Sequence, residues 1–220
     1  MNRELLFPTP IWQKDFPNSK KLNKHLFKHI KAWAREEPGV EKTNAGKGWH
    51  SETTMATKPE YNDLCQELFT MVKAIFKDYG LEMLFFLGNM WANINYPGAY
   101  NKIHLHPNST LSGAYYVKVP KDSADCIFVE DPRPGPNIIM PRRTDSVKDI
   151  RSLWRVVKYK PTEGHCIMFP AWVPHGVEEN RTKLKGDAGL RVSVSFNFVQ
   201  GKAPSKENLK KHGGYVPDEF

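Results

Sequence analysis

The stretch GLRVSVSFNFV, residues 189–199, alternates between polar and apolar side chains. Residues two apart in a β-strand point to the same face of a sheet. The polar face of this strand would carry Arg191, Ser193, Ser195 and Asn197, and the apolar face would carry Leu190, Val192, Val194 and Phe196. The pattern predicts a half-buried strand with one face on a core and the other on a polar space.

Further runs rich in β-branched and aromatic residues precede this strand and are separated by turn clusters containing proline and glycine. They cover residues 84–95, 101–106, 111–119, 126–130, 156–159 and 165–169. Two amphipathic helices are predicted before them, at 18–37 with Asn18 as N-cap, and at 59–79 with Pro59 in the first turn and Gly80 as the stop. This order predicts a mainly β fold, a double-stranded β-helix (jelly roll) with N-terminal supporting helices.

A chain of 220 residues suits a single domain. We expect an N-terminal strand and helical support over 1–80, a jelly-roll catalytic core over 81–200 and a polar C-terminal tail over 201–220. Cys65, Cys126 and Cys166 are scattered and form no paired spacing. Neither a leader-like apolar start nor a run of about 20 apolar residues is present, so we expect a cytoplasmic protein without a membrane span.

Positive charge is concentrated near one loop of a chain whose net charge is +8. The segment from Arg142 to Lys160 contains seven basic residues and two acidic ones, Asp145 and Asp149. It overlaps a long proline-rich insertion, residues 132–155, which indicates a surface loop at a functional rim. The basic segment is either an ordinary solvated loop or a rim that receives an anionic substrate.

Three histidines are the candidate metal ligands. His104 and His106 lie two apart in the predicted strand NKIHLH (101–106), so they would project together and could bind a divalent transition metal. The alternative is that His104 and His106 bind no metal and are ordinary polar residues whose hydrogen bonds are satisfied within the protein. His175 follows another strand and its proline-bracketed turn. Arg191 begins the polar face of the last strand, where a buried guanidinium requires an anion such as a carboxylate.

Taken in order, the motifs Tyr96-Pro-Gly, His104-x-His106, Tyr-Tyr116-Val, His175 and Arg191-x-Ser193 resemble the 2-oxoglutarate- and iron(II)-dependent dioxygenases, especially their prolyl-hydroxylase-like branch. The resemblance covers about residues 84–199, and residues 101–117 are also similar to a bacterial and phage subgroup. It implies that His104 and His175 bind Fe(II) and that Arg191, Ser193 and Tyr116 bind the cosubstrate 2-oxoglutarate. It also implies that Tyr96 is an aromatic residue near the metal, although core packing would explain either tyrosine equally well.

The sequence departs from the family pattern at His106, where the family has aspartate or glutamate. Three neutral imidazoles would leave the charge of the ion uncompensated, which favours a dianionic cosubstrate and makes zinc or copper more competitive with iron. Asp131 is a candidate for a carboxylate ligand from elsewhere. His50 is a candidate pocket residue, and no function is assigned to His25, His29, His165 or His212.

The leading hypothesis is an oxygenase that binds iron on His104, His106 and His175 and hydroxylates a substrate while 2-oxoglutarate is converted to succinate and CO2. A cupin-type dioxygenase with the same three histidines, acting without 2-oxoglutarate, is the second hypothesis. The third is a non-catalytic jelly-roll module with a structural zinc or an empty pocket. Structural zinc usually has four protein ligands, and only three are evident here.

Overall fold

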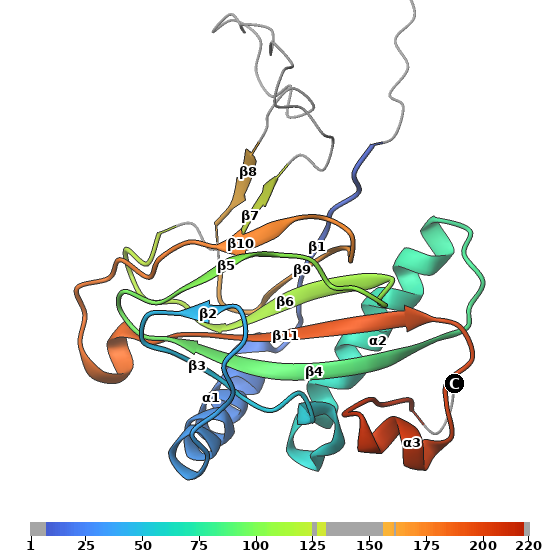
Figure 1. Cartoon of the computed structure of the whole chain (residues 1–220), viewed down its shortest axis with the longest axis horizontal. Helices are drawn as coiled ribbons and strands as arrows, with labels where there is room; N and C mark the ends of the chain where they lie inside the picture. The colour runs from blue at the N-terminus through green and yellow to red at the C-terminus, as the bar shows by residue number, and fades with distance from the viewer. Residues whose placement is uncertain (1–7, 125–126, 131–155, 161, 218–220) are drawn as a thin grey trace, which may run out of the picture.

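The computed structural model describes residues 8–124, 127–130, 156–160 and 162–217. Within these residues the strands form two antiparallel sheets that face each other, and the helices cover the outer side of the larger sheet (Figure 1). The larger sheet has the order β1-β9-β6-β11-β4-β3, and the smaller has the order β2-β5-β10-β7-β8. This arrangement confirms the mainly β jelly roll with N-terminal helical support.

The elements have the following bounds. The larger sheet contains β1 (Trp12–Asp15), β3 (Gly48–His50), β4 (Phe85–Asn95), β6 (Leu111–Lys118), β9 (His165–Pro170) and β11 (Arg191–Gln200). The smaller sheet contains β2 (Asn44–Ala45), β5 (Tyr100–His104), β7 (Ile127–Glu130), β8 (Val156–Tyr159) and β10 (His175–Val177). The α-helices are α1 (Ser19–Glu36), α2 (Asn62–Asp78) and α3 (Lys206–Lys211), with short 3-10 turns at Met55–Thr57, Pro59–Tyr61 and Gly186–Gly189.

Strand β11 lies between β4 and β6 and separates the main core from the pocket. Its apolar side chains, including Val192, Val194 and Phe196, are fully buried against the helices. Burial of one such side chain stabilises the fold by about 1.5–3 kcal/mol. The opposite face of β11 is directed toward the smaller sheet, which leaves its polar residues inside the jelly roll. The alternation in the sequence therefore determines which face of the sheet carries the site.

The helices begin differently from the prediction. Asn18 is the N-cap residue of α1, but its side chain makes no capping hydrogen bond and its φ is 53°. Its carbonyl oxygen instead accepts the N–H groups of Lys21 and Leu22, at 3.0 and 3.3 Å. The second helix starts as a 3-10 turn at Pro59–Tyr61 before α2 begins, and Gly80 ends it with a φ of +63°.

The end of the described chain is more ordered than the polar composition of residues 201–220 suggests. After α3, Tyr215 exchanges two backbone hydrogen bonds with Leu87 of β4, at 2.9 and 3.0 Å. Cys65 and Cys166 are buried free thiols, and Cys126 lies outside the described residues. In the part of the chain that the structure describes, no helix has the length and apolar character that a membrane span requires.

Candidate metal centre and active site

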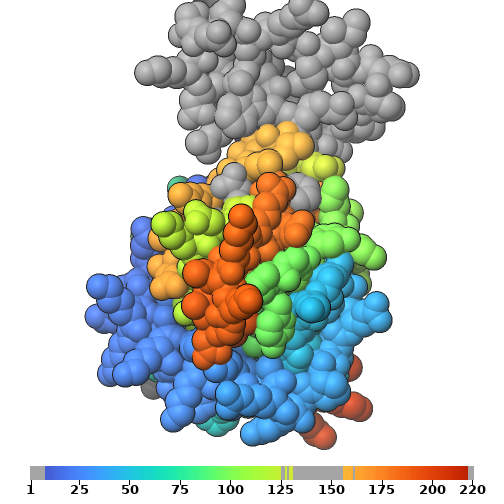
Figure 2. Space-filling view, turned by 90° about the vertical axis from the view of Figure 1, so that its left-hand side faces the viewer, coloured from blue at the N-terminus to red at the C-terminus, as the bar shows by residue number. Residues whose placement is uncertain are grey.

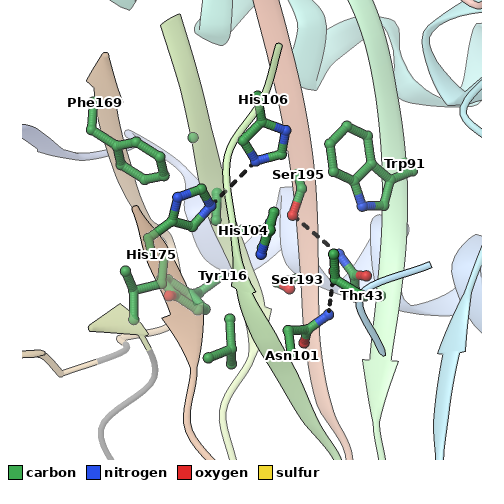
Figure 3. A pocket seen from close by; sticks show the side chains of 15 residues that line it. Thr43, Trp91, Asn101, His104, His106, Tyr116, Phe169, His175, Ser193 and Ser195 are labelled. Carbon is green, nitrogen blue, oxygen red and sulfur yellow. Dashed lines mark hydrogen bonds between the residues drawn. The ribbon is translucent and has the colours of Figure 1, made fainter. Parts of the chain in front are cut away.

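The three predicted histidines meet between the two sheets. His104 is the last residue of β5 and His175 is the first residue of β10, and the two are directly paired in the antiparallel ladder. His106 lies just beyond β5, where its backbone N–H donates to the carbonyl oxygen of Ala171 at 3.1 Å. One ring nitrogen of each histidine lies within 4.8 Å of the other two (Figure 3). The strand register and one loop contact therefore build the cluster.

Backbone carbonyl groups orient two of the rings. The Nδ1 atom of His104 is 2.7 Å from the carbonyl oxygen of Lys102, and that of His175 is 2.9 Å from the carbonyl oxygen of Val173. Because a carbonyl oxygen only accepts hydrogen bonds, each Nδ1 carries the proton and each Nε2 has a free lone pair. Metal-binding histidines are commonly oriented in this way through their second nitrogen.

The spacing of the nitrogens suits a shared ion. The Nε2 atoms of His106 and His175 are 3.2 Å apart. Two nitrogens that each lie about 2.1 Å from one metal, at an angle of roughly 90–110°, are separated by about 3.0–3.4 Å. Without an ion, this pair can share only one proton, donated by His106. The donor atoms, the tautomers of His104 and His175 and the separation of the nitrogens all fit a divalent transition metal.

Burial keeps these imidazoles neutral. Removal from water lowers the pKa of His106 to about 4, and the nearby His104 adds to the effect. Burial, followed by the proximity of His104, lowers the pKa of His175 to about 3. The pKa of His104 is lowered by burial as well. Neutral imidazole is the form that binds a metal, so the site is ready for an ion across the physiological pH range.

The pocket beside the histidines has one polar wall and one apolar wall. Hydroxyl and amide side chains from both sheets form the polar wall: Thr43, Asn93, Asn101, Ser193 and Ser195. Asn93 donates to Ser195 at 3.1 Å, and Asn101 is 3.5 Å from the hydroxyl of Thr43 (Figure 3). The apolar side includes Phe169, whose ring centroid is 4.5 Å from that of His175. A ligand here would meet the metal at one end and hydrogen-bonding groups along one side.

Tyr116 and Ser193 lie in one row across the larger sheet. Ser193 is paired with Tyr116 of β6 on one side and with Asn93 of β4 on the other, and all three line the pocket. Arg191 precedes Ser193 by two residues on the same strand face, which places it about 6.5–7 Å further along β11. The structure thus brings Tyr116 and Ser193 to the histidine pocket and positions Arg191 one row beyond them.

Arg191 is almost completely buried, with 1% of its surface exposed. Its terminal nitrogens donate to two backbone carbonyl oxygens, Nη1 to Ser123 at 3.1 Å and Nη2 to Glu178 at 2.6 Å. Its Nε atom is buried without a partner. Among the described residues no carboxylate forms an ion pair with this guanidinium. A buried cation that contacts only neutral groups is costly in free energy, and binding an anion would stabilise it.

Tyr96 does not join these residues. Strand β4 ends at Asn95, and Tyr96 is 40% exposed beside Ile94, on the sheet face opposite Trp91 and Asn93. The alternation along β4 explains this placement, because even-numbered residues there face away from the pocket. Asp131 and the basic residues from Arg142 to Arg155 lie outside the described residues. Among the residues described, the metal-binding group contains no carboxylate.

Several pocket residues were not predicted from the sequence. Trp91, Asn93 and Asn101 line the pocket, and the alternation of Trp91, Asn93 and Asn95 within the long run 84–95 was the available signal. His50, a candidate pocket residue, is buried and stacks on Trp91 with a centroid distance of 5.5 Å, but it does not line the pocket. Its Nδ1 donates to the carbonyl oxygen of Ser51 at 2.6 Å.

Comparison with known proteins relates this chain to one enzyme superfamily. Residues 89–197, about half of the chain, match the family described as "Putative 2OG-Fe(II) oxygenase". No curated protein matches the sequence. The matched segment contains His104, His106, His175 and Arg191.

Solved structures share the fold at low sequence identity. A Pseudomonas putida prolyl-4-hydroxylase is 16% identical, with a TM-score of 0.59 over 87% of this chain and 92% of that chain. HygX from Streptomyces hygroscopicus, solved with nickel, 2-oxoglutarate and hygromycin B bound, is 10% identical, with a TM-score of 0.59 over 87% and 83%.

A viral collagen prolyl hydroxylase from Paramecium Bursaria Chlorella virus-1, solved as a 2-oxoglutarate complex, is 11% identical, with a TM-score of 0.53 over 86% of this chain and 94% of that chain. At these identities the likeness concerns the fold. The fold, the three converging imidazoles and the matched family agree, and the chain belongs to the superfamily of 2-oxoglutarate- and iron(II)-dependent oxygenases.

Proposed function

We propose that this protein hydroxylates a C–H bond of its substrate, with His104, His106 and His175 as the three protein ligands of the iron. The observation that carries the proposal is the convergence of three neutral imidazoles, one buried and two partly buried, two of which donate from Nδ1 to backbone carbonyl oxygens. When bound, iron(II) with 2-oxoglutarate and O2 supplies oxidative chemistry in which one oxygen atom enters succinate, CO2 leaves, and the other oxygen atom becomes the product hydroxyl.

We propose Arg191 as the partner of the far carboxylate of 2-oxoglutarate, with Ser193 and Tyr116 beside it. The unpartnered Nε and the absence of an acidic partner among the described residues support this role. An arriving carboxylate would satisfy the charge of the guanidinium and replace or share its bonds to the two carbonyl oxygens. Ser193 and Tyr116 line the histidine pocket, with Arg191 two residues before Ser193 on β11, so they would position the body of the cosubstrate.

The pocket walls have a second role in this proposal. Phe169, Ile127 and Val177 exclude water from one side of the metal site, which protects a reactive centre from solvent. Asn101 and Thr43 on the polar side offer hydrogen-bonding groups that could orient a substrate. The substrate is proposed to be anionic. Lys158 of β8 and Lys160 are the described part of the expected basic rim, and Lys158 pairs with Glu178 at 2.5 Å.

Anaerobic titration of the purified protein with Fe(II) and 2-oxoglutarate tests the proposal. We expect a visible charge-transfer band from the chelate, and succinate once O2 is admitted. Arg191→Ala should weaken 2-oxoglutarate binding at least tenfold, because a buried charge-assisted pair is lost. Arg181→Ala removes an exposed arginine and serves as the matched control. Lack of a band, together with equal cosubstrate binding by both variants, would refute the proposed function.

A second candidate keeps the same metal ligands but uses no 2-oxoglutarate. It is favoured by one observation, the presence of three imidazoles without a carboxylate among the described residues. In this case Arg191 would bind a carboxylate of the substrate itself. Measuring O2 consumption with and without 2-oxoglutarate separates the two candidates, because only the first forms succinate in proportion to the oxygen consumed.

A further inference from the structure

Helix α1 carries a row of positive charge along its solvent side. Lys20, Lys24, Lys28, Lys31 and Arg35 follow each other at intervals of three or four residues, which keeps them within an arc of about 80° on the helix surface. The row spans about 22 Å along the axis. The helix contains six basic residues, with Lys21, and one acidic residue, Glu36, so it contributes +5 to the chain's net charge of +8.

The row is largely uncompensated. Lys31 pairs with Asp187, while Lys20, Lys24, Lys28 and Arg35 form no ion pair with any residue that the structure describes. Like charges three or four residues apart destabilise a helix. Lys20 also lies in the first turn, which contains no acidic residue and where the helix dipole disfavours a cation. An arrangement that weakens the helix in isolation would be relieved by a polyanion along the row.

A hollow adjoins the C-terminal end of this row. It has a volume of about 190 Å³ and lies between α1 and the loop before β11. Figure 2 shows this end of the molecule, with the loop in orange beside the N-terminal segment in blue. Lys31 and Arg35 form part of its rim, Ile94 and Leu190 are buried at its base, and Tyr96 supplies a half-exposed aromatic ring. The hollow therefore combines cations with an aromatic and apolar surface.

Other groups around the hollow are also charged. Asp187 lies on the rim and is exposed, and hydrogen bonding to Lys31, followed by the charges of Lys31, Arg35 and Lys118, lowers its pKa. Lys118 of β6 lies over the ring of Phe27 at 5.1 Å, next to the row. Cations thus outnumber the carboxylate at this end of the helix, and Asp187 remains available as a hydrogen-bond acceptor.

We propose that this surface binds single-stranded nucleic acid, with phosphates along the α1 row and a base in the hollow beside Tyr96. Rows of lysines next to aromatic side chains are typical of sequence-tolerant single-strand binding. An acidic protein would use the charges but not the aromatic hollow. A membrane would require an exposed apolar helix face, whereas the apolar face of α1, including Leu26, Ile30 and Trp33, is buried in the core.

The surface is separate from the metal site. Helix α1 packs on the outer side of the larger sheet, where Asn23 is bonded to Tyr115 and to the backbone of Tyr116, and the histidines lie on the inner side (Figure 1). Nucleic acid on α1 would tether the protein without entering the pocket. The proposal therefore stands or fails independently of the proposed oxygenase reaction.

Fluorescence anisotropy with a labelled dT12 oligonucleotide tests the proposal. We compare the wild type with Lys20→Gln/Lys24→Gln/Lys28→Gln and with a control of equal charge change, Lys77→Gln/Lys202→Gln/Lys210→Gln, at exposed sites elsewhere. At 50 mM salt the α1 variant should bind at least tenfold more weakly, and the control within about twofold of the wild type. The slope of the logarithm of the binding constant against the logarithm of the salt concentration should be smaller in magnitude by about 2 in the α1 variant. Each phosphate contact contributes about 0.7 to this slope for single strands, and the variant lacks three lysines.

The hollow is tested separately. Tyr96→Ala should weaken dT12 binding about fivefold or more but leave the binding of an abasic 12-mer unchanged, because only the base is expected to stack. The thermal stability of the α1 variant should equal or exceed that of the wild type, since repulsion is removed. Three results would overturn the proposal: no dT12 binding at 50 mM salt, an equal loss in the control triple variant, or tighter binding of polyglutamate or anionic vesicles than of dT12.

Discussion

The histidine cluster between the two sheets should make the metal-free protein sensitive to mild acid. His106 and His175 have pKa values lowered to about 4 and about 3, mainly by burial, whereas an unfolded histidine titrates near 6.5. Between those values the unfolded chain binds protons that the folded chain does not. Stability is therefore fully present above pH 6.5, is lost as the pH falls below it, and stops falling only below the folded pKa values.

The size of the effect follows from these shifts. At pH 5 both folded-state pKa values lie below the solution pH and the unfolded value lies 1.5 units above it, so each histidine costs about 2 kcal/mol relative to its fully deprotonated state. The two together lower the free energy of unfolding by about 4 kcal/mol. A domain of this kind is typically stable by only about 5–15 kcal/mol, so this loss is a large fraction of the total stability.

Urea unfolding of metal-free protein at pH 7.5, 6, 5 and 4.5 measures this loss directly. The His106→Gln/His175→Gln variant should lose most of the pH dependence, whatever its absolute stability, because glutamine does not titrate. His212→Gln changes an exposed histidine after α3 and should retain the wild-type dependence. If the double variant and the wild type lose stability equally between pH 7.5 and 5, the reasoning that these imidazoles are buried and neutral is wrong.

Three further outcomes are expected. Divalent metal at 100 times its Kd should stabilise the protein by about 2.7 kcal/mol, and His104→Ala or a chelator should remove that increment in thermal melts. Arg191→Met should lower the free energy of unfolding by about 2–4 kcal/mol, because the carbonyl oxygens of Ser123 and Glu178 lose their donors. Excess 2-oxoglutarate should no longer raise the melting temperature of this variant. An unchanged ligand-induced shift in melting temperature would contradict the proposed role of Arg191. Gly113→Ala should destabilise the protein by about 1–3 kcal/mol or prevent folding, because the added Cβ would lie 2.4 Å from the carbonyl oxygen of Ile167. Gly98→Ala is the control: open space surrounds this position, so the added Cβ meets no atom and only the backbone strain of the positive φ remains.

Periodicity accounts for the part of the fold that the sequence predicted. The strict alternation of residues 189–199 and the apolar stripes of the two long helices depend on local geometry, so the strands, the helices and the buried face of β11 follow from it. Short elements such as β2 and β10 have only two or three residues, too few for a period to be recognised, and exist because neighbouring strands pair with them.

The site residues also divide into those that the sequence could predict and those that it could not. The spacing of His104 and His106 and the buried position expected for Arg191 could be inferred locally, because they depend on the character of one strand. Tyr96 was placed near the metal by the resemblance alone, whereas it lies on the sheet face of Ile94, opposite Trp91 and Asn93. Asn93 and Asn101 were missed because each becomes a pocket residue only when the two sheets face each other.

The sequence alone determined the strand and helix content, the candidate metal ligands and the absence of a carboxylate at position 106, because these are properties of residue type and spacing along one segment. Tertiary structure decided three other things: that His175 meets His104 through strand register, that Arg191 is held by carbonyl groups of two distant loops, and that the α1 charges lie on the side of the sheet opposite the metal site. The physical reason is that contacts between residues far apart in the chain depend on how whole sheets and helices pack, which no single segment specifies.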